Sequence, residues 1–317
     1  MGCRWRDGMR DGEMLYYLIG LFTCFFFMYH IKIRYMKAAL CFLISYNHSL
    51  NKEHIWIDWI EANKDIINVY VHYKDRSQIR SPWLRKYALP ESCIVNTDYY
   101  HVVPAYLSVM KYGLFHDKEN QWFCFLTEAC VPIISPRKFR QMFLEHQTDS
   151  FMGWKPSWWN QSMIRRANLH RLTKEFHLAN TPWFVLNKDH AQRCIRYAHV
   201  NKGIYDLICD GRVANESIFA IILRSQNCLD SVQNEETTAT DWGRMMSPTS
   251  PYLFRFGDET DIRFIDTFLL ENKYTMFLRK VDPAFPDALL MKYIYGNADK
   301  NKDKKAPYDK ELLALVA

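Results

Sequence analysis

The sequence lacks the short motifs that most often reveal an enzyme's chemistry. It contains no G-x-x-x-x-G-K-[ST] phosphate loop, no G-x-G-x-x-G dinucleotide loop, no G-x-S-x-G nucleophile elbow and no H-E-x-x-H zinc motif. It has no D-x-D carboxylate pair, and its nine cysteines include no C-x-x-C pair with zinc-site spacing. These absences argue against the enzyme classes that such motifs define. The sequence also contains no motif that indicates a metal-binding site.

Charge of one sign is also scarce. The net charge is only +6, and no dense stripe of Lys and Arg with interleaved aromatic residues occurs. A nucleic-acid-binding protein usually concentrates its positive charge, so this class is disfavoured. A mild positive excess instead suits a pocket for a diphosphate. Aromatic residues are plentiful at 15%, which is typical either of a Trp-rich core or of flat surfaces that bind sugars.

One uncharged run stands near the amino terminus, at residues 14–29, and Ile31 and Ile33 extend it. We expect a membrane anchor over residues 14–31, within an amino-terminal region 1–37, although a buried core helix is the alternative. No small-x-small cleavage site follows, which argues against a removed signal peptide. Basic residues flank both ends equally, so the orientation stays open. In a eukaryotic host with a lumenal body, a single-pass, Golgi-like type II location is expected.

Residues 38–296 show alternating strand and helix patterns. Strands are predicted at 38–46, 66–73, 94–97, 122–127, 183–186 and 274–279, and helices at 52–63, 102–114, 137–146, 189–199 and 216–223. This alternation predicts an α/β domain with a mostly parallel central sheet flanked by helices. Ligands of such sheets bind at the carboxyl ends of the strands. The last residues, 297–317, are expected to form a charged, solvated tail.

Seven short strings in the body occur in a fixed order between residues 38 and 282. They are INVYVH at 67–72, HVVPA at 101–105, FLTEACVPI at 125–133, ANTPWF at 179–184, NESIFA at 215–220, DWG at 241–243 and FLRK at 277–280. Together they resemble the core-2/I-branching β-1,6-N-acetylglucosaminyltransferase family, which also contains the xylosyltransferases. The resemblance implies a GT-A type glycosyltransferase fold, a UDP-sugar donor, and inverting transfer that needs no divalent metal ion or other cofactor.

The resemblance also implies roles for residues in the reaction. Glu216 matches the position of the catalytic base, which removes the proton of the acceptor hydroxyl, and the alternative is an acid that only stabilises the first turn of a helix. Lys280 matches a phosphate-binding lysine, and its alternative is a solvated charge at a strand end. Neighbouring Arg279, and Arg255 at a greater distance along the chain, are further candidates for contacts with the donor diphosphate.

Aromatic and acidic residues are the candidates for sugar and nucleoside contacts. Trp242 matches an acceptor-side aromatic residue on which a sugar ring can stack, unless it lies in the core. Trp183 and Glu128 are further candidates for the acceptor or its hydroxyl groups. Asp75 is a candidate for the uridine or ribose.

Two departures from the family pattern leave the donor open. The family places Asp directly after its V-H-V strand, whereas here Tyr73 and Lys74 precede Asp75. Pro104 stands where some members have a donor-contacting Tyr.

We therefore expect a glycosyltransferase that moves a sugar, in the first instance N-acetylglucosamine, from a UDP-sugar to a carbohydrate hydroxyl in a β-1,6 branching reaction. Its partners would be the nucleotide sugar, a glycan acceptor and a membrane, without nucleic acid. Two alternatives stay open. One is an inactive, membrane-anchored sugar- or nucleotide-binding protein of the same fold, and the other is a xylosyltransferase-like enzyme.

Overall fold

The computed structural model describes residues 36–45, 47–159, 165–247 and 249–296. The expected anchor at 14–31 and the tail at 297–317 lie outside these ranges. Within them, no helix combines the length and the apolar character needed to span a bilayer. All seven cysteines in these ranges are free thiols.

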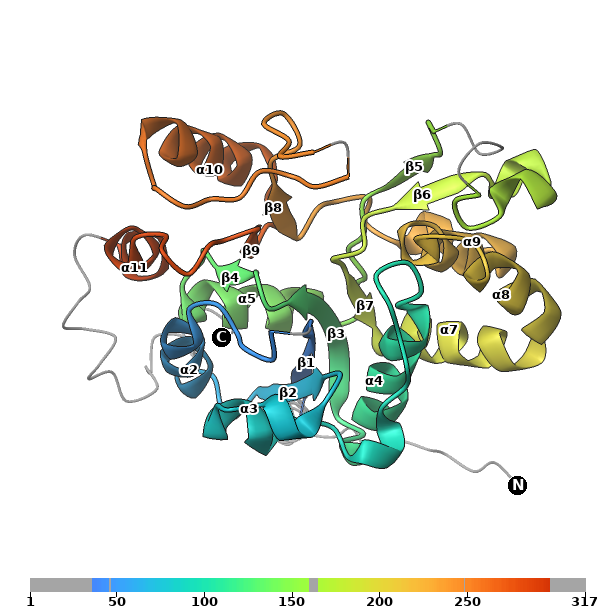
Figure 1. The fold of residues 1–317 in the computed structure, drawn as a ribbon, viewed down its shortest axis with the longest axis horizontal. Helices are drawn as coiled ribbons and strands as arrows, with labels where there is room; N and C mark the ends of the chain where they lie inside the picture. Colours follow the sequence, from blue (N-terminus) through green and yellow to red (C-terminus); the bar gives the residue numbers. More distant parts are fainter. Residues whose placement is uncertain (1–35, 46, 160–164, 248, 297–317) are drawn as a thin grey trace, which may run out of the picture. The chain divides into compact units, whose positions relative to one another are not determined.

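A sheet of four strands forms the centre of the described body, in the order β2–β1–β3–β7 (Figure 1). The strands are β1 (Lys37–Leu43), β2 (Ile67–His72), β3 (Asn120–Thr127) and β7 (Val185–Asn187). The first three are parallel, and β7 runs antiparallel to β3. Leu43 pairs with His72 on one side and Thr127 on the other, so the three parallel strands end level with one another. The predicted mostly parallel sheet is confirmed.

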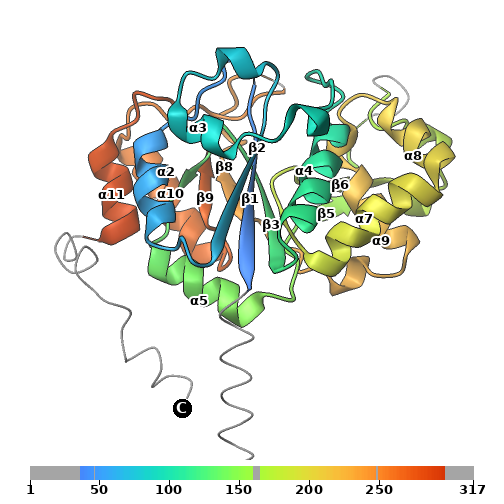
Figure 2. The same cartoon turned by 90° about the horizontal axis from the view of Figure 1, so that it is seen from below.

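Helices cover both faces of this sheet because strand side chains alternate between its two faces. On one face, Ala39 and Cys41 join a buried cluster with α4 (Val103–His116), α7 (Lys188–Val200) and α9 (Ile218–Ser225). On the other face, the ring centre of Phe42 lies 5.0 Å from that of Trp56 in α2 (Glu53–Glu61). The ring centre of Trp122 lies 5.3 Å from that of Phe143 in α5 (Pro136–His146). Figure 2 shows α4 and α7 on one side of the strands and α2 and α5 on the other. Burial on both faces explains the unbroken apolar run of β1.

Polar side chains fix where several helices begin. The side chains of Ser81, Ser135, Asn187 and Asp258 each accept a hydrogen bond from a backbone N–H three residues further on, and so cap α3 (Pro82–Tyr87), α5, α7 and α10 (Glu259–Glu271). Proline follows the cap directly in α3 and α5, where its missing N–H costs nothing.

Smaller strand pairings complete the body. The strand β9 (Phe277–Arg279) runs parallel to β8 (Thr238–Thr240) and antiparallel to β4 (Val131–Pro132), and β5 (Trp154–Pro156) pairs antiparallel with β6 (Leu178–Asn180). Within the described ranges, the remaining α-helices are α8 (Lys202–Cys209) and α11 (Asp287–Tyr295), and short 3₁₀ helices lie between the longer elements. Because β8 and β9 each have three residues, their register depends on their partners more than on their own sequence.

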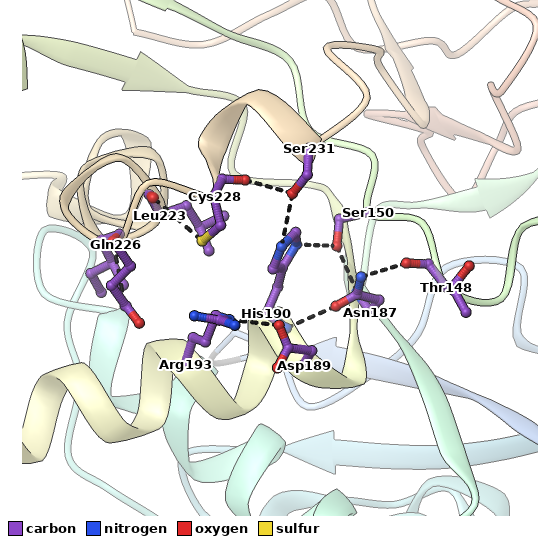
Figure 3. A network of polar contacts seen from close by, with 11 residues as sticks. Thr148, Ser150, Asn187, Asp189, His190, Arg193, Leu223, Gln226, Cys228 and Ser231 are labelled. Atoms are coloured by element: carbon purple, nitrogen blue, oxygen red, sulfur yellow. Dashed lines mark hydrogen bonds and ion pairs between the residues drawn. The ribbon is translucent and has the colours of Figure 1, made fainter.

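A buried histidine network joins three segments around the start of α7 (Figure 3). His190 contacts the Ser150 hydroxyl through Nδ1 at 2.8 Å and the Ser231 hydroxyl through Nε2 at 3.3 Å. The Ser150 oxygen also accepts the Asn187 N–H at 2.8 Å, and the Asn187 side chain accepts the His190 N–H at 2.8 Å. Burial lowers the pKa of His190, so the ring is held neutral in this network.

One predicted element is wrong in type, and one predicted helix begins later than expected. Residues 94–97 form no strand, because side chains take their backbone groups: His72 Nε2 accepts the Val95 N–H at 3.3 Å, and Lys74 donates to the Thr97 carbonyl. The predicted helix over 216–223 is split, since Glu216 closes the 3₁₀ helix Ala214–Glu216 and α9 begins at Ile218.

Candidate active site

A cavity of about 420 Å³ lies where the parallel strands end. Leu43, His72 and Thr127, the last residues of β1, β2 and β3, all line it. Its volume lies in the range of small-molecule sites. The expectation that the carboxyl ends of the strands build the site therefore agrees with the geometry.

Most of the predicted site residues meet in this cavity although they are far apart in the sequence. The lining includes six of the eight candidates, namely Glu128, Trp183, Glu216, Trp242, Arg279 and Lys280. Asp75 and Arg255 are not among the lining residues.

Glu216 lies between the cavity and a cation. Its Oε2 forms an ion pair with Arg166 Nη1 at 3.2 Å, and Arg166 does not line the cavity. Burial raises the pKa of Glu216, while the charges of Arg166 and Arg279 act in the opposite direction. A carboxylate with a raised pKa is better matched to accept a proton near neutral pH than an ordinary surface glutamate.

The chain around Glu216 is held by side-chain bonds and by an unusual backbone conformation. Asn180 donates to the Asn215 carbonyl at 2.9 Å and accepts the Ala220 N–H at 3.2 Å. Val213 has a φ of 48°, in the left-handed region that β-branched residues rarely adopt, and its carbonyl accepts the Glu216 N–H at 3.0 Å. Strained backbone of this kind persists where surrounding contacts determine it, often at functional sites.

Two cations occupy the end of β9. The guanidinium of Arg279 lies 4.5 Å from the centre of the Trp183 ring, which fixes it by a cation–π contact. Lys280, which follows through a cis peptide bond, donates from Nζ to the Ser250 hydroxyl at 3.0 Å. Burial lowers the pKa of both side chains, and the charge of Arg279 lowers that of Lys280 further. Adjacent, partly buried positive charges of this kind are stabilised by an anion.

Several polar atoms of the lining have no hydrogen-bond partner within the described ranges. They are Asn215 Oδ1, Thr181 Oγ1, Thr238 Oγ1 and Arg279 Nε, all of them buried. Buried polar atoms are almost always paired in folded proteins, so these four atoms, all on residues of one cavity lining, are candidates for contacts with a polar ligand.

Trp242 and Glu128 contribute an aromatic surface and a carboxylate to the lining. Trp242 is 49% exposed, so it does not lie in the hydrophobic core, which was the alternative interpretation of this residue. Asp241 holds the turn around Trp242 by accepting the N–H groups of Gly243 at 2.8 Å and Arg244 at 3.0 Å. Glu128 is near enough to Lys280 that its charge raises the pKa of that lysine.

The structure corrects the placement of Asp75. Its carboxylate turns back on its own loop, where it accepts from the Ser77 N–H at 2.9 Å, the Ser77 hydroxyl at 2.7 Å and Gln78 Nε2 at 2.9 Å. These hydrogen bonds lower the pKa of Asp75. Lys74 lines the cavity in its place and donates to the Thr97 hydroxyl at 2.6 Å. Of the two residues that follow Tyr73, the lysine therefore lines the cavity and the aspartate does not.

Arg255 is also corrected. Its neighbour Phe254 is fully buried, so in extended backbone the Arg255 side chain points the other way. It is exposed and lies over Phe256, with its guanidinium carbon 5.7 Å from the ring centre.

Sequence reasoning missed Arg166, Glu236, Thr181 and Thr238 as parts of the site or its support. Thr181 lies within the string ANTPWF, but the other three lie outside all seven strings that carried the family resemblance. Glu236 lies two residues before β8, and no pattern in its surrounding sequence marked it. In the described ranges, no three His, Cys, Asp or Glu side chains gather closely enough to hold a metal ion.

Comparison with known proteins gives one family match. Residues 40–265 match the family model described as Core-2/I-Branching enzyme. The match covers well over half of the chain and contains Glu128, Trp183, Glu216 and Trp242, and it ends before Arg279 and Lys280. No curated protein matches the chain.

Proposed function

The chain belongs to the Core-2/I-branching enzyme family, which is a family of glycosyltransferases, and on this premise we propose that it moves a sugar from a UDP-sugar to a carbohydrate hydroxyl with inversion at the anomeric carbon. The specific form of the proposal is transfer of N-acetylglucosamine in a β-1,6 branching reaction. The observation that carries it is the cavity that Glu216 shares with Arg279 and Lys280.

Glu216 is the proposed base. The acceptor hydroxyl oxygen attacks the anomeric carbon while its proton passes to the Glu216 carboxylate, and the bond from the anomeric carbon to the phosphate oxygen breaks. Because Arg166 pairs with Oε2, Oε1 is the oxygen left for the acceptor. Base catalysis by a positioned carboxylate typically contributes ~10²–10⁴-fold in rate.

Arg279 and Lys280 are proposed to stabilise the departing diphosphate. The leaving UDP gains negative charge as the bond breaks, and fixed cations beside it lower the energy of the transition state. The Arg279 Nε is buried without a partner in the described part of the chain, so it has a donor to offer. We propose that these side chains supply the positive charge without a divalent metal ion.

The test is a panel of UDP-sugars incubated with the protein and a mixture of oligosaccharide acceptors, once with EDTA and once with manganese. The proposal expects release of UDP and a new glycosidic product in EDTA, with UDP-N-acetylglucosamine the preferred donor. Product formation that depends on manganese would contradict the metal-independent mechanism. Binding of UDP without any transfer would favour the inactive binding protein.

A further inference from the structure

A third glutamate, Glu236, lines the same cavity as Glu128 and Glu216 and has no part in the transfer step described above. No hydrogen bond or ion pair joins its carboxylate to another described residue, and burial raises its pKa while the charge of Lys155 opposes that shift. A partly buried carboxylate without a hydrogen-bond donor is costly, because its desolvation is not compensated. A donor supplied by a ligand would remove that cost.

Glycine at position 153 gives this carboxylate its place. A Cβ on residue 153 would lie 3.1 Å from Glu236 Cγ and 3.1 Å from Thr181 Cγ2, tighter than ordinary contact. The backbone of Gly153 therefore lies against both side chains and brings them close to each other. Any larger residue would push Glu236 or Thr181 aside.

Hydrogen bonds on both sides fix the two segments that meet here. Met152 N–H donates to the Gln233 carbonyl at 3.0 Å, and Trp154 N–H donates to Asn234 Oδ1 at 2.7 Å. Thr181 N–H donates to the Gly153 carbonyl at 2.8 Å. Glu236 and Thr181 are thus presented by paired backbone and not by a free loop.

Two threonines of the same lining also carry hydroxyl groups. Thr181 Oγ1 and Thr238 Oγ1 are buried and lack partners among the described residues, and Thr238 is only 4% exposed. A carboxylate accepts hydrogen bonds, and a hydroxyl both donates and accepts. This combination matches neighbouring hydroxyl groups on a sugar ring, each of which is also a donor and an acceptor.

We propose that Glu236, Thr181 and Thr238 form a subsite that binds the hydroxyl groups of a sugar ring, separate from the base and from the two cations at the end of β9. The inference rests on the proposed function and deepens it. The ring belongs either to the donor sugar or to the acceptor, and the experiment distinguishes these sources.

The variant is Glu236→Gln, and the matched control is Glu235→Gln, which removes the neighbouring charge outside the cavity lining. Thr238→Val is a second variant, because it removes a hydroxyl at nearly constant volume. Calorimetry measures affinity for UDP and for UDP-N-acetylglucosamine. An array of immobilised oligosaccharides with labelled UDP-N-acetylglucosamine measures acceptor use. Thermal unfolding of each variant reports whether the fold is intact.

If the subsite exists, Glu236→Gln leaves the affinity for UDP within about twofold of the wild type. It weakens either the affinity for UDP-N-acetylglucosamine or acceptor use on the array by about 10- to 100-fold, which is the usual effect of losing a hydrogen bond to a charged group. A loss in the affinity for UDP-N-acetylglucosamine assigns the donor sugar, and a loss confined to the array assigns the acceptor. Thr238→Val is expected to weaken the same measured quantity as Glu236→Gln. Glu235→Gln is expected to change neither the affinity for UDP-N-acetylglucosamine nor acceptor use on the array.

Three results would overturn the subsite. If the wild type binds UDP and transfers sugar but Glu236→Gln changes neither reading, the subsite fails and the proposed function stands. If Glu236→Gln weakens UDP itself as much as the sugar, the residue supports the cavity and does not bind hydroxyl groups. A wild type that binds no UDP overturns the proposed function, and the subsite with it.

Discussion

Glu216 is subject to two opposed influences at the scale of a single side chain. Burial favours its neutral form, and the ion pair with Arg166 at 3.2 Å favours the carboxylate. A general base must be ionised at the start of the reaction and still accept a proton readily. Arg166 lies outside the cavity lining, so it acts on the reaction through Glu216 and is a positioning residue.

Replacing Arg166 with Gln removes the charge that favours the ionised carboxylate. The pKa of Glu216 then rises, and the acid limb of the kcat/KM profile moves to higher pH. Arg166→Lys keeps a positive charge and is expected to restore part of the shift. Measurement of kcat/KM from pH 5 to pH 9 checks this. An acid limb that stays in place in Arg166→Gln would show that the ion pair does not control the base.

The pair Arg279–Lys280 gives a second prediction at this scale. Lys280→Ala removes a cation proposed to face the departing diphosphate, and kcat is expected to fall about 10²- to 10³-fold, as for the loss of one transition-state contact. Lys273, an exposed lysine whose Nζ lies over the Tyr274 ring, provides the control variant Lys273→Ala with kcat unchanged. A fall of less than threefold in Lys280→Ala would contradict the role.

At the scale of elements, buried histidines join the ends of strands to loops. His72 ends β2 and accepts the Val95 N–H, which holds the loop 94–97 over the strand end. Burial lowers the pKa of His72 to about 4, and it also lowers the pKa of His190 in the network at α7. A neutral ring has one nitrogen that accepts a hydrogen bond, and protonation turns that nitrogen into a donor, so a protonated His72 cannot accept the Val95 N–H.

These histidines predict a loss of stability in acid. The unfolded rings titrate near pH 6.5 and the folded rings lower, so the unfolded state binds more protons below pH 6.5. The free energy of unfolding therefore falls as the pH drops from about 6.5 to about 4, and the full shift of His72 corresponds to ~3 kcal/mol. Chemical denaturation at pH 7 and pH 4.5 measures it.

His72→Gln should make this part of the pH dependence smaller, while substitution of the exposed His199 by Gln should leave it unchanged. An equal pH dependence in all three proteins would show that His72 does not contribute to the acid effect.

Long strands were predictable from the sequence, and of the short ones only β7 and β9 were. The strands β1, β2 and β3 are apolar on both faces and 6 to 8 residues long, so their patterns specify them without a partner. The strands β4, β5 and β8 have two or three residues each and exist because neighbouring strands supply their hydrogen bonds. Residues 94–97 look like a strand, but side chains of the β2 end take their backbone groups.

At the scale of the whole body, the cavity is assembled from segments that the sequence keeps far apart. The parallel strand ends provide His72, Thr127 and Glu128, whereas Glu216 and Lys280 come from the second half of the chain. Motif order was enough to predict that most candidates belong to one site. It was not enough to place Asp75, whose carboxylate caps its own loop, or to find Arg166 and Glu236, which become relevant only through their neighbours in space.

The most direct test of the account is the substitution Glu216→Gln, assayed in EDTA for both UDP affinity and sugar transfer. The amide keeps the size of the side chain and cannot accept the acceptor proton as a base. We predict UDP affinity within about threefold of the wild type and transfer reduced at least ~10²-fold. Transfer that continues at the wild-type rate, with UDP still bound, would show that Glu216 is not the base of this enzyme.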